Sequence, residues 1–302
     1  VDWWIMMKLL DSTKPAELPT ESLLARLRSR RAGIDLLDPV ATEPTEASVW
    51  VYQRLNNRLR FRLEPFFELL AMRNLTLQLR YLLAGEMPAT ILSNSLLAKP
   101  LRQLLANSGE NQALIAQLEA ALVSDYPFTF GLTVTYREQG PGGVERQLAD
   151  GMLVDALERS RNLPLKRTLG YLVDMRNCLM LSRLWRWQVK QPPTLTDGGS
   201  LDRNNLQRIW ARHDSERLTS LAERLTGESL RNSKRDGGVT IGMEQAFLRG
   251  LTRLLRRLGR DPLGLAVIIE YLWRVELAVH NQFLRKNLSD DRDSLLEEVL
   301  LL

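Results

Sequence analysis

Leucines and other apolar residues recur along most of the chain at spacings of three and four residues, separated by arginine, glutamine and glutamate. This spacing places the apolar side chains on one face of an α-helix, whereas a half-buried strand would need strict alternation. The pattern therefore predicts a mainly α protein. Helices are expected at residues 21–31, 47–63, 66–83, 93–105, 112–123, 150–163, 165–189, 201–213, 215–225, 243–258, 262–286 and 290–301.

One segment follows a different pattern. Apolar residues at 128, 130, 132, 134 and 136 alternate with threonine and glycine, and the run Gly140-Pro141-Gly142-Gly143 comes next. Alternation followed by glycine and proline is typical of a strand that ends in a tight turn. We predict a small β-hairpin near residues 128–146. Residues 191–199 are expected to form a linker and residues 234–238 a loop, and Asp261-Pro262 is predicted to begin the last long helix.

Internal repetition is the most informative feature of the chain. The sequence Met-Arg-Asn ends at Asn74 and again at Asn177, and Asn281 follows at almost the same interval. On a helix each asparagine shares a face with apolar residues, such as Val173 and Met180 around Asn177. A buried amide without hydrogen-bond partners costs about 1–3 kcal/mol, so each asparagine would favour one particular packing. For Asn177, with Asp174 nearby, we expect a hydrogen bond to another helix.

These asparagines predict three related helical units within a single domain of residues 1–302. The units are expected at residues 1–105, 106–200 and 201–302. The alternative is that three unrelated asparagines occur by chance in a long chain rich in leucine and arginine.

Composition limits the classes of function. The 302 residues carry 41 Lys and Arg against 36 Asp and Glu, a net charge of +5, so a folded globular protein is expected. A single cysteine, Cys178, excludes an intrachain disulfide and, with only two histidines, leaves too few residues for the usual Cys/His zinc sites. The apolar stretch near residue 3 is far too short to cross a bilayer. No metal ion and no cofactor is expected.

Catalytic motifs are absent from the sequence. It contains no phosphate-binding loop, no GxGxxG, no Gly-x-Ser-x-Gly and no HExxH, so an enzyme is not expected. Adjacent His213, Asp214 and Ser215 favour helix capping over a catalytic relay, and Cys178 favours a packed thiol over a nucleophile. Glu276 lies in an apolar helix, where a structural ion pair is favoured over a proton-handling role.

A basic face is predicted on the helix that precedes Asp261. Its residues are Arg249, Arg253, Arg256, Arg257 and Arg260. The small net charge and the lack of a recognition-helix or aromatic RNA-binding pattern favour a solvated face, or a docking surface for an acidic partner, over a nucleic-acid site. A helical adaptor or nucleic-acid-binding module that uses residues 249–260 remains the alternative function.

Several short motifs together resemble the funnel-shaped central-stalk protein of V-type rotary ATPases, known as the C subunit in prokaryotes and the d subunit in eukaryotes. The strongest lies after Asp261-Pro262-Leu263, and the resemblance extends from about residue 47 to the end of the chain. Ala71 and Ala278 stand where that family often has acidic residues. The motif residues are Arg73, Asn74, Tyr171, Asp174, Arg176, Asn177, Tyr271, Glu276, Asn281 and Arg285.

The resemblance implies a pseudo-threefold funnel of three helical units on the cytoplasmic face of the membrane proteolipid ring. The rotor shaft would enter its wide end. Such a protein has no catalytic residues and no cofactor, touches the membrane only indirectly, and transmits torque between shaft and ring during ion transport.

Overall fold

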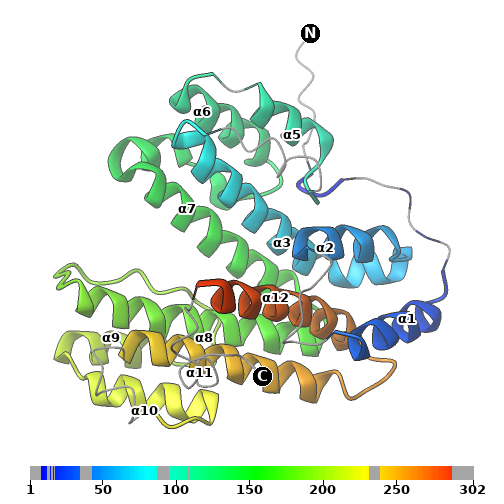
Figure 1. Cartoon of the computed structure of the whole chain (residues 1–302). Helices are drawn as coiled ribbons and strands as arrows, with labels where there is room; N and C mark the ends of the chain where they lie inside the picture. Colours follow the sequence, from blue (N-terminus) through cyan, green and yellow to red (C-terminus); the bar gives the residue numbers. More distant parts are fainter. Residues whose placement is uncertain are drawn as a thin grey trace. The chain divides into compact units, whose positions relative to one another are not determined.

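The computed structural model describes residues 8–11, 14, 16, 18–34, 43–86, 95–107, 109–230 and 239–287. In this part of the chain the secondary structure is α-helical, apart from one short 3₁₀ helix and an isolated antiparallel bridge between Leu10 and Leu97 (Figure 1). The prediction of a mainly α protein is confirmed. The expected helix at 290–301 and the expected loop at 234–238 lie outside the described residues.

The chain divides into two compact units. Unit 1 comprises Val1–Thr20 and Thr45–Arg161, and unit 2 comprises Glu21–Pro44 and Asn162–Leu302. The helix α1 (Thr20–Ala32) therefore belongs almost entirely to unit 2, although most of that unit comes from the second half of the sequence.

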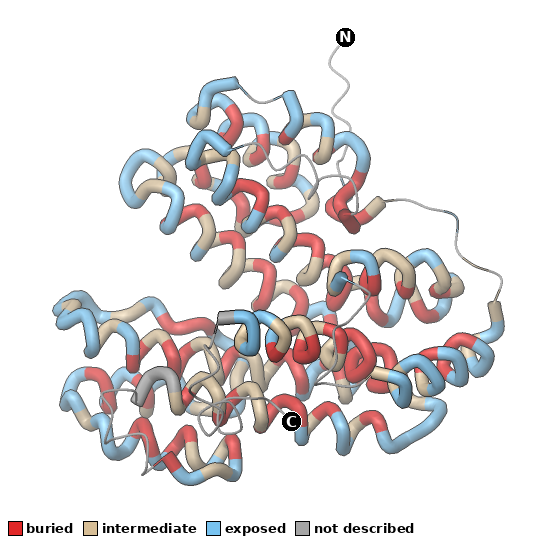
Figure 2. Tube along the Cα trace, in the orientation of Figure 1, coloured by how far each residue is buried: buried red, intermediate tan, exposed pale blue. Residues whose placement is uncertain are grey.

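Unit 1 is built around two long helices, α3 and α7, which pack against each other and carry buried residues along much of their length (Figure 2). Asn56 begins α3 by accepting a hydrogen bond from the Leu59 backbone N–H at 3.0 Å, and this cap separates α2 from α3 within the predicted helix 47–63. The elements of unit 1 are α2 (Pro44–Gln53), α3 (Asn57–Leu83), α5 (Lys99–Ala106), α6 (Asn111–Leu122), η1 (Pro127–Thr129) and α7 (Leu132–Arg159).

The predicted β-hairpin near 128–146 is wrong, because this segment is helical. The helix α7 breaks at Gly140, whose φ of 66° suits glycine. A Cβ on Gly143 would lie 2.5 Å from the Gln139 Cβ and 3.0 Å from the Thr135 Cγ2. The two parts of α7 therefore pack closely at this point, and the glycine-rich run forms a turn between helical segments instead of between strands.

The start of α7 is fixed by a carboxylate from another helix. Glu119 of α6 accepts hydrogen bonds from the Gly131 N–H at 2.7 Å and from the Thr133 N–H at 2.8 Å and hydroxyl at 2.6 Å. Burial alone would raise the pKa of Glu119, but these hydrogen bonds bring that pKa below its ordinary value. Because a distant residue supplies this cap, the local alternation at 128–136 does not decide the structure.

Unit 2 packs α8 against α10, α11 and α12. Its buried core includes Cys178, Leu181 and Phe247. At the start of α12, residues 265–272 are all buried, so this segment is enclosed instead of amphipathic. Besides α1, the helices are α8 (Leu163–Arg186), α9 (Arg203–Arg212), α10 (Ser215–Thr226), α11 (Val239–Leu258) and α12 (Ala266–Asn287).

Two expected helix starts in unit 2 have different outcomes. The Asp214 side chain accepts a hydrogen bond from the Arg217 N–H at 3.0 Å, so the capping interpretation is confirmed. Asp261-Pro262 does not begin α12, because Asp261 accepts from the Leu263 and Gly264 N–H groups in a separate turn. The helix then starts at Ala266.

Candidate functional site

The middle asparagine motif ties α8 to the linker that follows it. Asn177 is only 3% exposed, and its side chain donates to the Thr196 carbonyl at 2.8 Å and accepts from the Thr196 N–H at 2.9 Å. The expected hydrogen bond to another helix is therefore wrong. The amide instead satisfies both backbone groups of one linker residue, much as a neighbouring strand would.

Asp174, one turn earlier on α8, holds the end of the same linker. Its buried carboxylate, 1% exposed, accepts from the Ser200 N–H at 2.9 Å, the Ser200 hydroxyl at 2.6 Å and the Leu201 N–H at 3.0 Å. A Cβ on Gly199 would lie 2.1 Å from the Asp174 Oδ1, so this approach requires glycine. We call this set of hydrogen bonds from Asp174 and Asn177 to Thr196, Ser200 and Leu201 the α8 clamp.

The first motif, on α3, has a different environment. Asn74 is half-buried and Arg73 is exposed, while Leu77 is 39% exposed. Leu77, which shares a helical face with Asn74, is thus exposed, so this face of α3 is only partly buried. The buried face of α3 instead passes through Ala71, Met72, Leu75, Gln78 and Leu79.

In the third motif, Tyr271 and Asn281 are buried within α12, Glu276 is half-buried and Arg285 is exposed. The middle motif's Arg176 is half-buried on α8. The motif residues thus lie on three helices, and they range from buried to exposed: the three copies do not have the same environment.

Tyr171 joins α8 to α11. Its hydroxyl donates to the Phe247 carbonyl at 2.9 Å, and the two rings meet edge to face with centroids 5.9 Å apart. Burial raises the pKa of Tyr171 above its ordinary value, so the phenol remains a protonated donor. A Cβ on Gly250 would lie 2.2 Å from the Tyr171 Oη and 3.2 Å from the Thr226 Cα. Gly250 therefore allows α8 and the end of α10 to approach α11.

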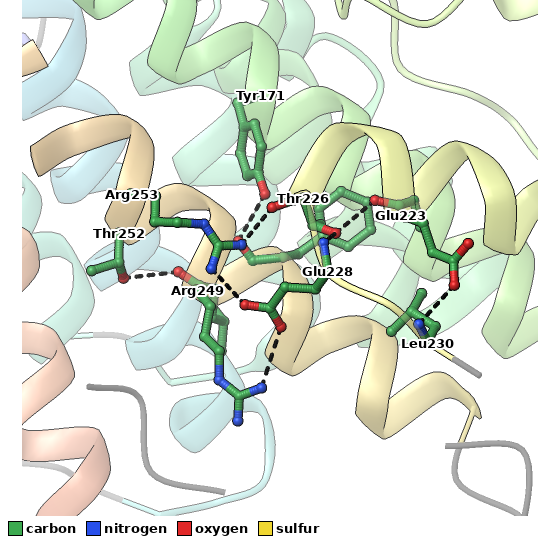
Figure 3. Close-up of polar contacts among 11 residues, drawn as sticks. Tyr171, Glu223, Thr226, Glu228, Leu230, Arg249, Thr252 and Arg253 are labelled. Carbon is green, nitrogen blue, oxygen red and sulfur yellow. Dashed lines mark hydrogen bonds and ion pairs between the residues drawn. The ribbon is translucent and has the colours of Figure 1, made fainter. Parts of the chain in front are cut away.

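Part of the predicted basic face is neutralised within the molecule (Figure 3). Glu228 accepts from the Arg253 Nη1 at 2.7 Å and from the Arg249 Nη1 at 3.3 Å. Arg253 also donates to the Thr226 carbonyl. Two of the five arginines thus fasten the end of α10 to α11, and the carboxylate of Glu228 offsets one of their two positive charges.

The other three arginines of this face lie at the end of α11 and beyond it. Arg256, Arg257 and Arg260 are exposed, and no carboxylate among the described residues forms an ion pair with them. The candidate docking surface therefore lies at one end of the predicted face instead of along its whole length.

A partly buried ion pair lies beside that end. Glu270 of α12 is 4% exposed and accepts from the Arg31 guanidinium of α1 at 2.5 Å. Arg274, one turn later on α12, donates to the Arg31 carbonyl at 2.9 Å. Sequence reasoning gave attention to Glu276 and missed this pair. An acidic residue inside a long apolar run was a usable signal, but its partner lies 239 residues away.

A second buried carboxylate in unit 1 was also missed. Glu68 of α3 accepts from the Tyr126 hydroxyl at 2.6 Å and from the Arg159 guanidinium of α7. Arg159 is also paired with Asp155. Burial raises the pKa of Glu68, although the hydrogen bonds from Tyr126 and Arg159 oppose this effect. This network joins α3, the residue before η1, and α7 inside one unit.

The described residues offer little for chemistry. No group of three or more His, Cys, Asp or Glu side chains gathers among them in a way that could hold a metal ion. Cys178 is buried, and burial raises the pKa of its thiol to about 12, so a nucleophilic thiolate is disfavoured. None of the described helices is both long enough and apolar enough for a membrane span.

These features define a helical protein whose buried polar groups join helices and linkers, with an exposed basic surface at one place. Residues 62–281 match the family model described as ATP synthase (C/AC39) subunit. The chain belongs to this family, which comprises the C and d subunits of V-type ATPases, and is thus a subunit of a rotary ATPase. No curated protein matches the chain.

Proposed function

We propose that this protein is the non-catalytic central-stalk subunit that links the rotor shaft to the membrane proteolipid ring and transmits torque for ion transport. The observation that carries the proposal is the family match over residues 62–281, which includes all three asparagines. In this proposal the protein lies on the cytoplasmic face of the membrane and contacts the bilayer only indirectly.

Rigid polar connections support this role. A torque-transmitting subunit has to resist shear, and buried hydrogen bonds that join successive elements give such resistance, because sliding would leave buried polar groups unsatisfied. The α8 clamp is a connection of this kind, and the more exposed contacts of Glu228 with Arg249 and Arg253 add a link between the segment after α10 and α11. The motif residues are accordingly assigned structural roles, and the arrangement of three units around a pseudo-threefold axis is part of the proposal.

The charges of α11 favour a protein partner over a nucleic acid. A long basic face could follow a phosphate backbone, but Arg249 and Arg253 are already held by Glu228, which offsets one of their two charges. The basic surface left over is short and suits a protein partner better.

The decisive experiment measures ATP-driven ion uptake in membrane vesicles with and without this subunit. We expect ATP hydrolysis by the catalytic head to continue without the subunit, while uptake stops because the head and the ring are uncoupled. A co-sedimentation assay with the proteolipid ring provides the second readout. Unimpaired uptake without the subunit, or failure of the protein to co-purify with any rotor component, would reject the proposal.

The isolated protein should also neither bind nor hydrolyse ATP, because the sequence has no loop of backbone amides followed by a lysine to hold phosphates. Equilibrium dialysis with labelled ATP measures binding directly, and a phosphate-release assay measures turnover. Saturable ATP binding by the purified chain would contradict the non-catalytic assignment.

A further inference from the structure

Three helices of unit 2 bring arginines to one place. Arg31 near the end of α1 forms an ion pair with Glu270 of α12, and Arg274 of α12 donates to the Arg31 carbonyl. The end of α11 also lies close to Glu270, because a Cβ on Gly259 would lie 2.0 Å from the Glu270 Oε2. Arg256 lies one turn before Gly259, and its positive charge acts on Arg274. We call Arg31, Arg256 and Arg274 the arginine cluster.

The cluster carries more positive charge than its own carboxylate compensates. Of the three guanidinium groups, only that of Arg31 is paired with a carboxylate among the described residues, that of Glu270, which is almost wholly buried. Burial lowers the pKa of Arg274, and the positive charges of Arg256 and then Arg31 lower it further, although Glu270 opposes them. The Arg274 Nε is buried and finds no hydrogen-bond acceptor among the described residues. Guanidinium groups in this condition attract an additional anionic group.

The surface next to the cluster remains basic and accessible. Arg256, Arg257 and Arg260 are exposed at the end of α11. Asp261, the next acidic residue along the chain, is also exposed and its carboxylate accepts from the Leu263 N–H at 3.1 Å, but the three arginines outnumber it. The positive surface thus extends from half-buried guanidinium groups out to fully exposed ones.

We propose that the arginine cluster and the adjoining Arg260 form a docking surface for an acidic segment of a protein partner, whose Asp or Glu carboxylates pair with these arginines. The inference rests on the proposed function, in which the partner is another subunit of the rotary ATPase. Arginine suits this task because its planar fork binds a carboxylate through two parallel hydrogen bonds.

The geometry favours a short acidic protein segment over a nucleic acid. A nucleic acid would need cationic side chains spread along its backbone, and the next turns of α11 offer only arginines that Glu228 already holds. Beside this surface, Arg31 already binds one carboxylate, that of the buried Glu270, at 2.5 Å.

The test measures binding of a fluorescent oligoglutamate peptide to the purified full-length protein by fluorescence anisotropy at low ionic strength. The variant Arg256→Gln/Arg260→Gln removes two exposed charges without touching the buried Glu270 pair. The matched control is Arg208→Gln/Arg217→Gln, which removes two exposed charges from α9 and α10 of the same unit. Both variants change the net charge equally, so non-specific attraction changes equally.

We expect the cluster variant to bind the peptide about tenfold more weakly, since an exposed ion pair contributes up to about fivefold, and the control to bind it almost as well as the unchanged protein. Equal weakening in both variants, or no weakening, would overturn the inference. Cluster-dependent binding that is tighter for single-stranded DNA, or for vesicles of anionic lipid, than for the peptide would overturn it as well.

A second measurement separates this inference from the proposed function. The complex is purified from membranes that contain each variant, and the salt concentration that releases the subunit is determined. Release of the cluster variant at lower salt than the control supports the docking surface. If both variants and the unchanged protein stay bound equally, the docking inference fails while the proposed function stands. If the unchanged protein does not purify with the complex, the proposed function fails.

Discussion

The sequence Met-Arg-Asn occurs on α3 and on α8, yet the two copies differ in burial and in hydrogen bonding. On α8, Asn177 is buried and binds both backbone groups of Thr196. On α3, Asn74 is half-buried beside an exposed Leu77. The residue three positions before the asparagine also differs: Asp174 on α8 is replaced by buried Ala71 on α3.

Six positions before each asparagine the two copies differ again. Tyr171 on α8 donates to the Phe247 carbonyl, whereas Glu68 on α3 accepts from Tyr126 and Arg159. The α8 copy therefore bonds mainly to backbone groups, while the buried acid of α3 bonds to side chains. The same short motif gains or loses a structural role according to the polar residues that share its helical face.

The largest expected effect comes from making the α8 copy resemble the α3 copy. Asp174→Ala should lower the free energy of unfolding by about 3 kcal/mol, because the Ser200 and Leu201 N–H groups lose their acceptor inside the protein. Urea denaturation measures the change. The control Asp197→Ala removes an exposed linker acid paired with Arg203 and should cost at most about 0.5 kcal/mol. Similar losses in the two variants would show that the α8 clamp has no special importance.

The next effect distinguishes the two asparagines directly. Asn177→Leu should cost about 2 kcal/mol while leaving helicity almost unchanged, because the Thr196 N–H and carbonyl lose buried partners. Asn74→Leu should change the free energy of unfolding by less than about 1 kcal/mol. Circular dichroism gives helicity, and amide hydrogen exchange at Thr196 reports local opening. Equal costs at both sites would contradict the comparison.

A third test concerns the position of Tyr171. Gly250→Ala would normally favour a helix by about 1 kcal/mol, but here the new methyl group would clash with the Tyr171 hydroxyl. We expect a net loss of about 1–2 kcal/mol in thermal or urea unfolding. The double variant Tyr171→Phe/Gly250→Ala has no hydroxyl for the new methyl group to meet. Its loss of stability should therefore be smaller than the sum of the losses in the two single variants. Additive losses would mean that the close approach does not limit the packing.

The smallest expected effect is a dependence on pH in unit 1. Because burial raises the pKa of Glu68 in the folded protein, the protonated form is favoured there, and its contribution to stability is lost as the pH rises through that folded pKa. As the pH rises through the acidic range, the natural protein should therefore lose stability relative to the Glu68→Gln variant. A difference that is constant with pH would contradict the raised pKa. The control Glu138→Gln removes an exposed acid of α7 in the same unit, outside the Glu68 network, and its effect should change less with pH.

Much of the fold could be predicted because its signals are local. The spacing of apolar residues gave the helices of both units, and Asp214 gave the start of α10. The hairpin at 128–146 could not be excluded locally, since its outcome depends on Glu119 of α6 and on the contact of Gly143 with Gln139. Four arginines of the predicted basic face lie on α11 and Arg260 lies beyond its end, but the effective charge of the face depends on Glu228, which follows a different helix.

The sequence by itself determined the helical class, the positions of the three asparagines and the resemblance that the family match confirms, because periodicity and short motifs are properties of neighbouring residues. Only the tertiary structure decided which polar groups are buried and which partners they have. Arg31 and Glu270 show the physical reason: their pairing joins residues 239 positions apart, and the free energy of a buried charge depends on what surrounds it in space.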